Sequence, residues 1–433
     1  MKSHGHLLRV LGVGFGLAVI IGNTIGAGIF KTPGTIAAQL PSPTPFLLVW
    51  VGAGIYALLG AISLAELGTM IPRSGGQYVF ARYALGEYAG FVVGWSDWIS
   101  SCGSTAAVSL LIGKFSETLF PALAGRGPVV AATVAILFAL LQWHGIVWGS
   151  NTQNVTSLLK ALAFLALIVA GFIFGGHGAL TTPTPKATSA ITITAIIVSL
   201  QAAIYTYDGW NGVIYFSEEV KQPGRDIPRA LIGGVLIIIA IYLFVNVSLL
   251  YVLPIASIAG KEFAAGEAAN AIFGAHGDTI FRVLTIASML SGINALHLMA
   301  TRVVFAMSRD GLFTKKAAVV NEGGTPTVSL FLSAAVALVF IVFGQTFDTV
   351  INVLAFFFVA NYILSFISLF VLRRREPDKP RPFRAWGYPF TTALALLGSM
   401  LFLAGAMWAD RTSSLYAVLG LAVSYPVYLL MKR

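Results

Sequence analysis

Residues 22–30 read GNTIGAGIF, with three glycines inside a stretch that is otherwise as apolar as a membrane helix. Glycine destabilises a helix interior because it loses more conformational freedom on folding than any other residue. Three glycines near the middle of the first apolar run therefore predict an interruption of that helix.

The composition assigns this run to a membrane protein. The chain has 433 residues, 57% of them hydrophobic and 10% charged, whereas soluble domains carry about 25% charged residues. Apolar runs of the roughly 20 residues that a bilayer crossing needs recur from end to end. The N-terminal sequence MKSHGHLLRVLG has no cleavable signal pattern, so we expect the first run to be a retained helix.

Charge and cysteine content exclude several other classes. A net charge of +10 is compatible with nucleic-acid binding, but in a membrane chain it follows from the gathering of Lys and Arg on the cytoplasmic side. The single cysteine, Cys102, excludes an internal disulfide framework and a multi-cysteine metal site. We expect no metal, no cofactor and no nucleic-acid partner.

We expect an all-α protein with twelve crossings, at residues 11–38, 44–70, 88–117, 128–147, 152–175, 191–219, 229–252, 280–308, 327–345, 347–372, 387–408 and 413–431. With the N-terminus inside, 19 of the 27 basic residues fall on the cytoplasmic side and seven outside, and Lys160 lies within a crossing. This bias predicts that both termini are cytoplasmic.

A second interruption occurs in the sixth crossing, at YTYDGWNGV (205–213). Interrupted segments at matching positions in two halves are typical of transporters with inverted repeats. We expect one transport domain over 1–433, with repeats at 11–175 and 191–372 and two further helices at 387–431. Close helix packing is the other interpretation of such glycines, but the matched pair favours a binding site.

The two breaks predict the chemistry of that site. A half-helix that starts near Gly26, Ala27 and Gly28 presents free N–H groups and a positive dipole end, which suit a carboxylate. The preceding half of the sixth crossing ends near Tyr205, and its carbonyl groups, with that of Thr24, suit an ammonium group. Together they describe the backbone of an α-amino acid. The aromatic residues Tyr207 and Trp210 are candidates to line the cavity, although packing is the commoner role of such residues.

Four motifs carry a family resemblance: GNTIGAGIF, LAELGTMIPRSGGQYVFARYALGEYAGFVVGW (64–95), YDGWNGVIYFSEEVKQPGRDIPRA (207–230) and LRRREPDKPRPFRAWGYP (372–389). They resemble the amino acid–polyamine–organocation (APC) superfamily, and within it the L-type amino acid transporters and their bacterial relatives. The resemblance implies the leucine-transporter fold, alternating access, and Na⁺-independent movement of amino acids, usually by exchange.

The resemblance implies substrate contacts at the positions of this chain that match the family's motifs. These positions are Asn23, Thr24, Gly26, Ala27, Gly28, Tyr205, Asp208 and Gly209. Many relatives have Ser at the place of Ala27, so a hydroxyl contact is missing here. Animal L-type proteins have Gly at the place of Asp208, which puts a strict preference for large neutral substrates in doubt. Their external cysteine, which bonds a heavy-chain partner, has no counterpart at about 118–127, so we expect no such partner.

Two charged residues lie within crossings. Lys160 matches a family lysine that fills the place of the ion in Na⁺-coupled relatives and braces the first helix against the eighth. It could be a fixed brace or a titrating proton carrier, and snorkelling to the cytoplasmic surface is the plainer alternative. Asp208 could select substrates, pair with a donor such as Lys160, or cap a half-helix.

Other polar residues have ordinary interpretations. Glu66 and Asp97 lie near crossing ends and are expected to partner basic loops, and His297 is expected to be a packing residue that could face the cavity. The charges at 218–226 are expected to form a solvated loop cluster, with a role in gating as the alternative.

Rival functions find less support. An enzyme would need a catalytic or nucleotide motif, and HExxH, GxSxG and the P-loop are all missing from the sequence. A channel would need a filter or a charged ring, and a sensor that kept the fold but lost transport is the third alternative. We therefore expect a plasma-membrane transporter of neutral L-amino acids working by exchange, with proton symport or a polyamine or cationic amino acid permease as alternatives.

Overall fold

A computed structural model describes residues 7–26, 28–176, 178, 180, 191–343, 347–409 and 411–432. Within this part the regular structure is helical, and the β contacts are two isolated bridges, Leu11 with Val220 and Val320 with Pro326. The first eight α-helices are α1 Val13–Thr24, α2 Gly28–Gln39, α3 Pro43–Met70, α4 Gln77–Leu85, α5 Glu87–Leu119, α6 Gly127–Trp143, α7 Ile146–Phe174 and α8 Ile193–Tyr207. The others are α9 Pro223–Val252, α10 Ile255–Ile258, α11 Ala264–Phe273, α12 Gly277–Arg309, α13 Thr327–Phe343, α14 Phe347–Arg375, α15 Phe390–Ala409 and α16 Arg411–Met431.

Short 3₁₀ helices complete the chain. They are η1 Pro121–Leu123, η2 Gly212–Phe216, η3 Gly274–His276 and η4 Lys315–Ala318. Of these, η2 matters most for the site because it follows the break in the sixth predicted crossing.

Seven helices of the described part are long and apolar enough to cross a membrane, by length and composition: α3, α7, α9, α12, α14, α15 and α16. The bent pair α1 and α2 adds an eighth span if the two are counted as one. Each of the twelve predicted ranges largely overlaps one helix or one broken pair, although several ends differ. The apolar helices α6 and α13 have 17 residues each, so length alone does not establish twelve crossings, and that number stays a prediction.

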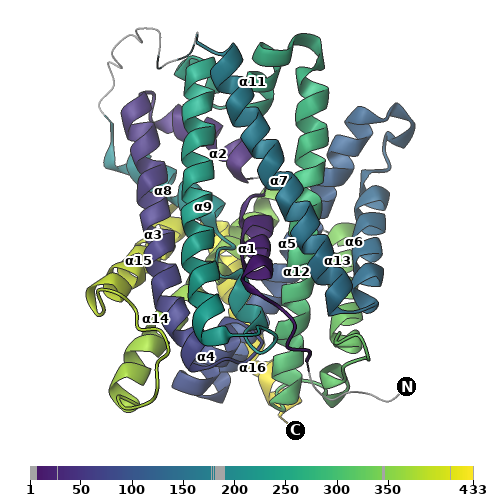
Figure 1. Ribbon diagram of the computed structural model, residues 1–433, viewed down its shortest axis with the longest axis vertical. Coiled ribbons are helices and arrows are strands. Elements are labelled where there is room, and N and C mark those ends of the chain that lie inside the picture. The colour runs from purple at the N-terminus through teal and green to yellow at the C-terminus, as the bar shows by residue number, and fades with distance from the viewer. Residues whose placement is uncertain are drawn as a thin grey trace.

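Figure 1 shows the helices running mostly along the long axis of the molecule. The end that carries α11 is called the upper end below, and the end that carries α4 the lower end. The helix α16 finishes at the lower end, toward which the chain before α1 also runs (Figure 1). The broken helix lies inside the bundle, since α1 packs against α7, α9 and α12.

The boundary between α6 and α7 differs from the prediction. The sequence predicted a connection at 148–151, but the chain turns at His144 and Gly145, whose φ is +139°. Ile146 already belongs to α7, and its N–H donates to the carbonyl of Gly323 at 2.8 Å. Residues 148–151, predicted as a connection, therefore belong to α7.

The end of α14 and the loop between α14 and α15 both contact Glu66 of α3, which is fully buried. Its carboxylate lies 2.6 Å from Nη2 of Arg373 and 3.0 Å from Nε of Arg381, and it accepts the N–H of Ala385 at 2.7 Å. The interpretation of Glu66 as a partner of the basic loop is confirmed.

Candidate functional site

The first break separates α1 from α2. α1 ends at Thr24, and Ile25 leaves the helical region with φ −77° and ψ 86°. α2 starts at Gly28 after a bend of 48°, and it lies above α1 in Figure 1. Ala27, one of the predicted contacts, lies outside the described residues. The start of α2 at Gly28 leaves its first N–H groups without partners in the helix.

The second break follows α8. Asp208 has an extended ψ of 150°, and Gly209 has φ +102°, a conformation that residues with a side chain rarely adopt. The chain then forms η2, which has only five residues. The α8 helix therefore ends in a turn, where the carbonyl of Tyr205 accepts the N–H of Asp208 at 3.1 Å.

Hydrogen bonds hold the two breaks side by side. The hydroxyl of Tyr242 donates to the carbonyls of Thr24 at 2.8 Å and of Thr206 at 3.0 Å. The hydroxyls of Thr32 and Thr206 are 2.6 Å apart, and the amide of Asn23 donates to the carbonyl of Gly209 at 3.4 Å. The amino end of α2 and the carboxyl end of α8 thus face the same space.

That space is a cavity of about 1060 Å³. It extends to Lys114 and Glu262, whose side chains are about 60% exposed and lie 3.4 Å apart near the upper end. Gly209 lies behind Asn23, outside the cavity wall. Six of the eight predicted contacts line the cavity: Asn23, Thr24, Gly26, Gly28, Tyr205 and Asp208.

Lys160 is the cation at the first break. Its Nζ donates to the carbonyl of Gly22 at 2.8 Å and to that of Ile25 at 2.5 Å, and the residue is 2% exposed. Because α7 begins at Ile146, Lys160 is near the middle of the helix, about four turns from its start. The side chain therefore does not snorkel to the surface, and it does not pair with Asp208.

Two carboxylates line the cavity, each held by a tyrosine. Asp208 accepts a hydrogen bond of 2.6 Å from Tyr362. Asp97 accepts bonds of 2.8 and 2.9 Å from the hydroxyl of Tyr215. The interpretation of Asp97 as a partner of a basic loop is wrong, because α5 carries it about three turns inward to face η2. An acid in the interior of an apolar helix was the available signal.

Several ion pairs lie at the lower end. Glu219 and Arg302 are both fully buried and share hydrogen bonds of 3.0 and 2.9 Å. Glu218 lies 2.6 Å from Arg309, and Asp310 lies 2.9 Å from Arg73. The prediction of a solvated cluster at 218–226 is therefore wrong for Glu219. Its buried partner is 83 residues away in the chain, beyond the reach of local pattern.

Residues 16–429 match a family model described as "Amino acid permease". The chain belongs to the amino acid permease family. It is 31% identical over 433 residues to the serine/threonine exchanger SteT of Bacillus subtilis (strain 168), covering 99% of this chain and 98% of that one. It is 26% identical over 426 residues to the human b(0,+)-type amino acid transporter 1, with 95% and 86% covered. It is also 26% identical over 439 residues to the mouse large neutral amino acids transporter small subunit 2, with 98% and 81% covered.

The resemblance to the APC superfamily and its L-type branch is therefore confirmed. As an amino acid permease, the chain is a multi-pass membrane transporter with amino acid substrates.

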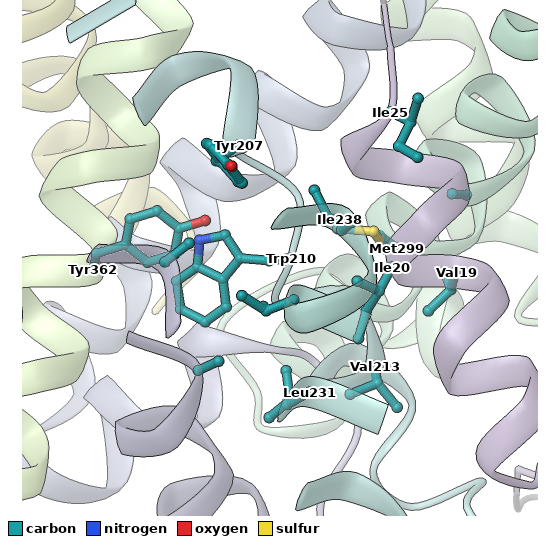
Figure 2. Close-up of a cluster of buried hydrophobic side chains, with 14 of the residues drawn as sticks. Val19, Ile20, Ile25, Tyr207, Trp210, Val213, Leu231, Ile238, Met299 and Tyr362 are labelled. Atoms are coloured by element: carbon teal, nitrogen blue, oxygen red, sulfur yellow. The ribbon is translucent and has the colours of Figure 1, made fainter. Parts of the chain in front are cut away.

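Three residues that were candidates for the permease's cavity wall pack elsewhere. Tyr207 lies against Tyr242, with ring centroids 4.9 Å apart, and His297 hydrogen-bonds the backbone of Ala135. Trp210 is stacked on Tyr362 at 5.0 Å (Figure 2) and borders only a small recess of about 10 Å³. For Trp210 the reason is the turn at 208–211, in which Gly209 has a positive φ and the indole packs on Tyr362.

Apolar side chains fill the space between the breaks and η2. Figure 2 shows Ile20 of α1 among Val213 of η2 and Leu231 and Ile238 of α9. All four are at most 1% exposed. These four side chains therefore pack α1, η2 and α9 of the permease against one another.

Gly209→Ala is expected to reduce transport at least tenfold. A Cβ at this position would lie 2.7 Å from the side-chain nitrogen of Asn23 and 3.1 Å from its carbonyl carbon. The positive φ adds a backbone cost of about 1–3 kcal/mol. The measurement is the initial rate of amino acid uptake in proteoliposomes containing equal amounts of folded protein.

Gly14→Ala is the matched control, because no heavy atom lies within 4 Å of its added Cβ and its backbone is helical. It should leave uptake unchanged. Uptake by Gly209→Ala within twofold of the unmodified protein would contradict the importance of this break.

Proposed function

We propose that this permease is a secondary transporter that exchanges neutral L-amino acids across the plasma membrane by alternating access, without Na⁺. The observation that carries the proposal is the meeting of two broken helices, hydrogen-bonded to one another, at one large cavity. The similarity to a serine/threonine exchanger and to a large neutral amino acid transporter supports the substrate class and the exchange mode.

The substrate's α-carboxylate binds the N–H groups at the start of α2, from Gly26 to Gly28, where free donors and the helix dipole favour an anion. Its α-ammonium binds the carbonyl groups at the end of α8, near Tyr205. The side chains of Asn23 and Thr24 and the segment Asp208–Gly209 complete the binding site. Since residue 27 is alanine, the backbone alone contacts the carboxylate there.

During the transport cycle the two ends of the cavity open alternately. In this conformation the upper end, which we propose is external, is open, while pairs such as Glu219 with Arg302 close the lower end. The proposal includes twelve crossings, cytoplasmic termini and two inverted repeats. Rocking of one repeat against the other would break the lower pairs and seal the upper end.

Lys160 acts in this proposal as a permanent cation where coupled relatives hold an ion. Its ammonium binds two carbonyls of the first break and therefore replaces Na⁺ there. The protein works without a resident metal or cofactor, without enzymatic activity, and without a disulfide-linked heavy chain; its one cysteine, Cys102, is buried in α5.

Proteoliposomes test the proposal. Vesicles are empty or preloaded with unlabelled L-serine, and uptake of labelled L-serine is followed without Na⁺ and without a pH gradient. We expect uptake at least tenfold faster into preloaded vesicles. Equal uptake into both would mean uniport, and uptake that requires an inward proton gradient would mean symport.

A labelled mixture of L-amino acids serves as the wider probe. If no component of the mixture enters either set of vesicles, amino acid exchange is excluded. Polyamines and other amines would then be tested in the same assay.

A further inference from the structure

We propose that the loop between α14 and α15, together with the start of α9, binds the headgroup of an anionic phospholipid at the lower end. The residues that carry the proposal are the exposed side chains of Arg225, Arg229, Arg374, Arg384 and Trp386. We call this set the basic face. The inference goes beyond the proposed function, because it concerns a lipid partner and does not depend on the substrate or on the exchange mode.

Contacts bring the two segments of the basic face together at the lower end. Arg375, the last residue of α14, donates to the carbonyls of Tyr83 at 2.7 Å and Ala84 at 3.1 Å, both in α4 (Figure 1). At the start of α9, a Cβ added to Gly224 would lie 3.0 Å from the Cβ of Pro382. The loop therefore contacts both α4 and α9, and basic residues that are far apart in the sequence lie close together.

The basic face carries positive charge that the protein leaves unbalanced. Residues 221–229 and 373–384 contain nine basic and three acidic residues, and the acidic ones are Asp226, Glu376 and Asp378. Glu66 of α3 adds a fourth acidic residue through its pairs with this loop, so nine positive charges against four negative ones leave a net charge of +5. Within the described part of the chain, no ion pair includes any of the four arginines of the basic face. An anionic ligand would neutralise part of this excess.

Exposed aromatic rings place the loop at the level of the lipid headgroups. The helix α15 is long and apolar enough to cross a membrane, and its 20 residues match the thickness of the hydrocarbon core. Its first residue, Phe390, therefore lies at the membrane boundary, and that side chain is 77% exposed. Trp386 is 59% exposed, and its ring packs on Phe383 with centroids 5.5 Å apart. Such rings are typical of the membrane interface, so they favour a lipid over a soluble anion as the partner.

The arginines lie at the ends of two other candidate spans. Arg374 is in the last turn of α14, and Arg225 and Arg229 are one turn apart on the same side of α9, near its start. Long arginine side chains lay their apolar stems along lipid tails and keep the charged group at the interface. A guanidinium also binds a phosphate group with two parallel hydrogen bonds. The basic face therefore has the chemistry that a phospholipid headgroup requires.

Buried hydrogen bonds fix the shape of the loop. The side chain of Arg381 is 1% exposed, and its Nε lies 3.0 Å from the carboxylate of Glu66. Its Nη2 donates to the carbonyls of Leu372 at 3.1 Å and Glu376 at 2.8 Å. Arg384, three residues later, remains exposed. A binding surface that is already ordered loses less conformational entropy when its ligand binds.

Fluorescence quenching of Trp386 tests the binding directly. The full chain is reconstituted in phosphatidylcholine vesicles that contain increasing fractions of brominated phosphatidylglycerol or brominated phosphatidylcholine. The signal of Trp386 is the difference between the unmodified protein and Trp386→Phe. We expect half-maximal quenching at a fraction of the anionic lipid at least tenfold lower than that of the zwitterionic one.

Charge variants identify the residues that bind the lipid. A basic residue near an anionic membrane surface contributes about 1 kcal/mol, which is about fivefold in binding. Arg374→Gln combined with Arg384→Gln should therefore reduce the preference for phosphatidylglycerol at least tenfold. The matched control is Lys315→Gln with Lys316→Gln, because both lysines are exposed in η4 and the change in net charge is the same. The control should change the preference less than twofold.

Three results would overturn the proposal. Equal quenching by the two brominated lipids in the unmodified protein would reject the site. An equal loss of preference in the η4 control would mean a diffuse attraction by the whole surface. Loss of the preference in sodium phosphate, but not in sodium chloride of the same ionic strength, would mean a site for a free anion. Because the readout is lipid binding, each of these results leaves amino acid exchange to be judged by its own uptake assay.

Discussion

Replacing Lys160 by alanine should reduce amino acid exchange to background. The ammonium group donates to two backbone carbonyls at the first break, of Gly22 at 2.8 Å and of Ile25 at 2.5 Å. Hydrogen bonds to a charged group contribute about 1.5–3 kcal/mol each, and a buried acceptor left without a donor costs about 1–3 kcal/mol. Even about 3 kcal/mol corresponds to roughly a hundredfold in rate.

The measurement is serine exchange in proteoliposomes with matched protein amounts, together with the size-exclusion profile to show that the variant is folded. Lys261→Ala is the control, because that side chain is 48% exposed and pairs with Glu267 at the surface. It should change exchange less than twofold. If Lys160→Ala retained half of the exchange rate, the cation at the break would not be required.

Lys160→Arg separates the two roles left open for this residue. Arginine stays charged at every accessible pH, so a variant that still exchanges serine would support a fixed brace. If Lys160 instead carries a proton, serine exchange by the unmodified protein should depend on pH, and Lys160→Arg should lose that dependence.

The second large effect is expected on stability. Arg302→Met should lower the free energy of unfolding by about 3–5 kcal/mol, because it leaves the carboxylate of Glu219 buried without its partner. Both side chains are fully buried, and two hydrogen bonds of 3.0 and 2.9 Å join them. The guanidinium also lies 5.3 Å from the ring of Phe216 in η2, so the pair fastens α12 to the segment after the second break.

A double-mutant cycle with thermal unfolding in detergent is the measurement. Glu219→Gln combined with Arg302→Met removes the orphaned charge, and it should recover at least half of the stability lost in Arg302→Met. Lys261→Ala and Glu267→Gln form the matched exposed pair, for which the unfolding temperature should stay unchanged. If Arg302→Met also left the unfolding temperature unchanged, the buried pair of Glu219 and Arg302 would contribute nothing to stability.

The segment from η2 to Glu219 connects the cavity with the ion pairs at the lower end. Tyr215 and Glu219 are close in sequence: the first orients Asp97 at the cavity, and the second holds Arg302 below it. A movement of η2 would therefore change the cavity floor and the lower ion pair together. This is the physical link through which substrate binding can act on the closed end.

The sequence by itself determined the class of the protein and the location of the breaks. Runs of about 20 apolar residues cannot be accommodated by a soluble fold of this composition, and they reappear as helices close to the predicted ranges. The glycines at 26, 28 and 209 indicated where the helices end, because local backbone freedom depends on the residues at that point. Lys160 and Asp208 were found because ionisable residues are rare inside apolar helices.

Only the tertiary structure decided which polar groups meet. Asp97 and Tyr215 are 118 residues apart, and Glu219 and Arg302 are 83 apart. Their pairing depends on how α5, η2 and α12 pack, and no local pattern records it. The same reason explains why Trp210 stacks on Tyr362 and borders only the small recess. It also explains why Lys160, about four turns from the start of α7, meets the first break. The position of a backbone break depends on residues that are adjacent in the sequence. The charge of a cavity depends on side chains that packing brings together from distant segments.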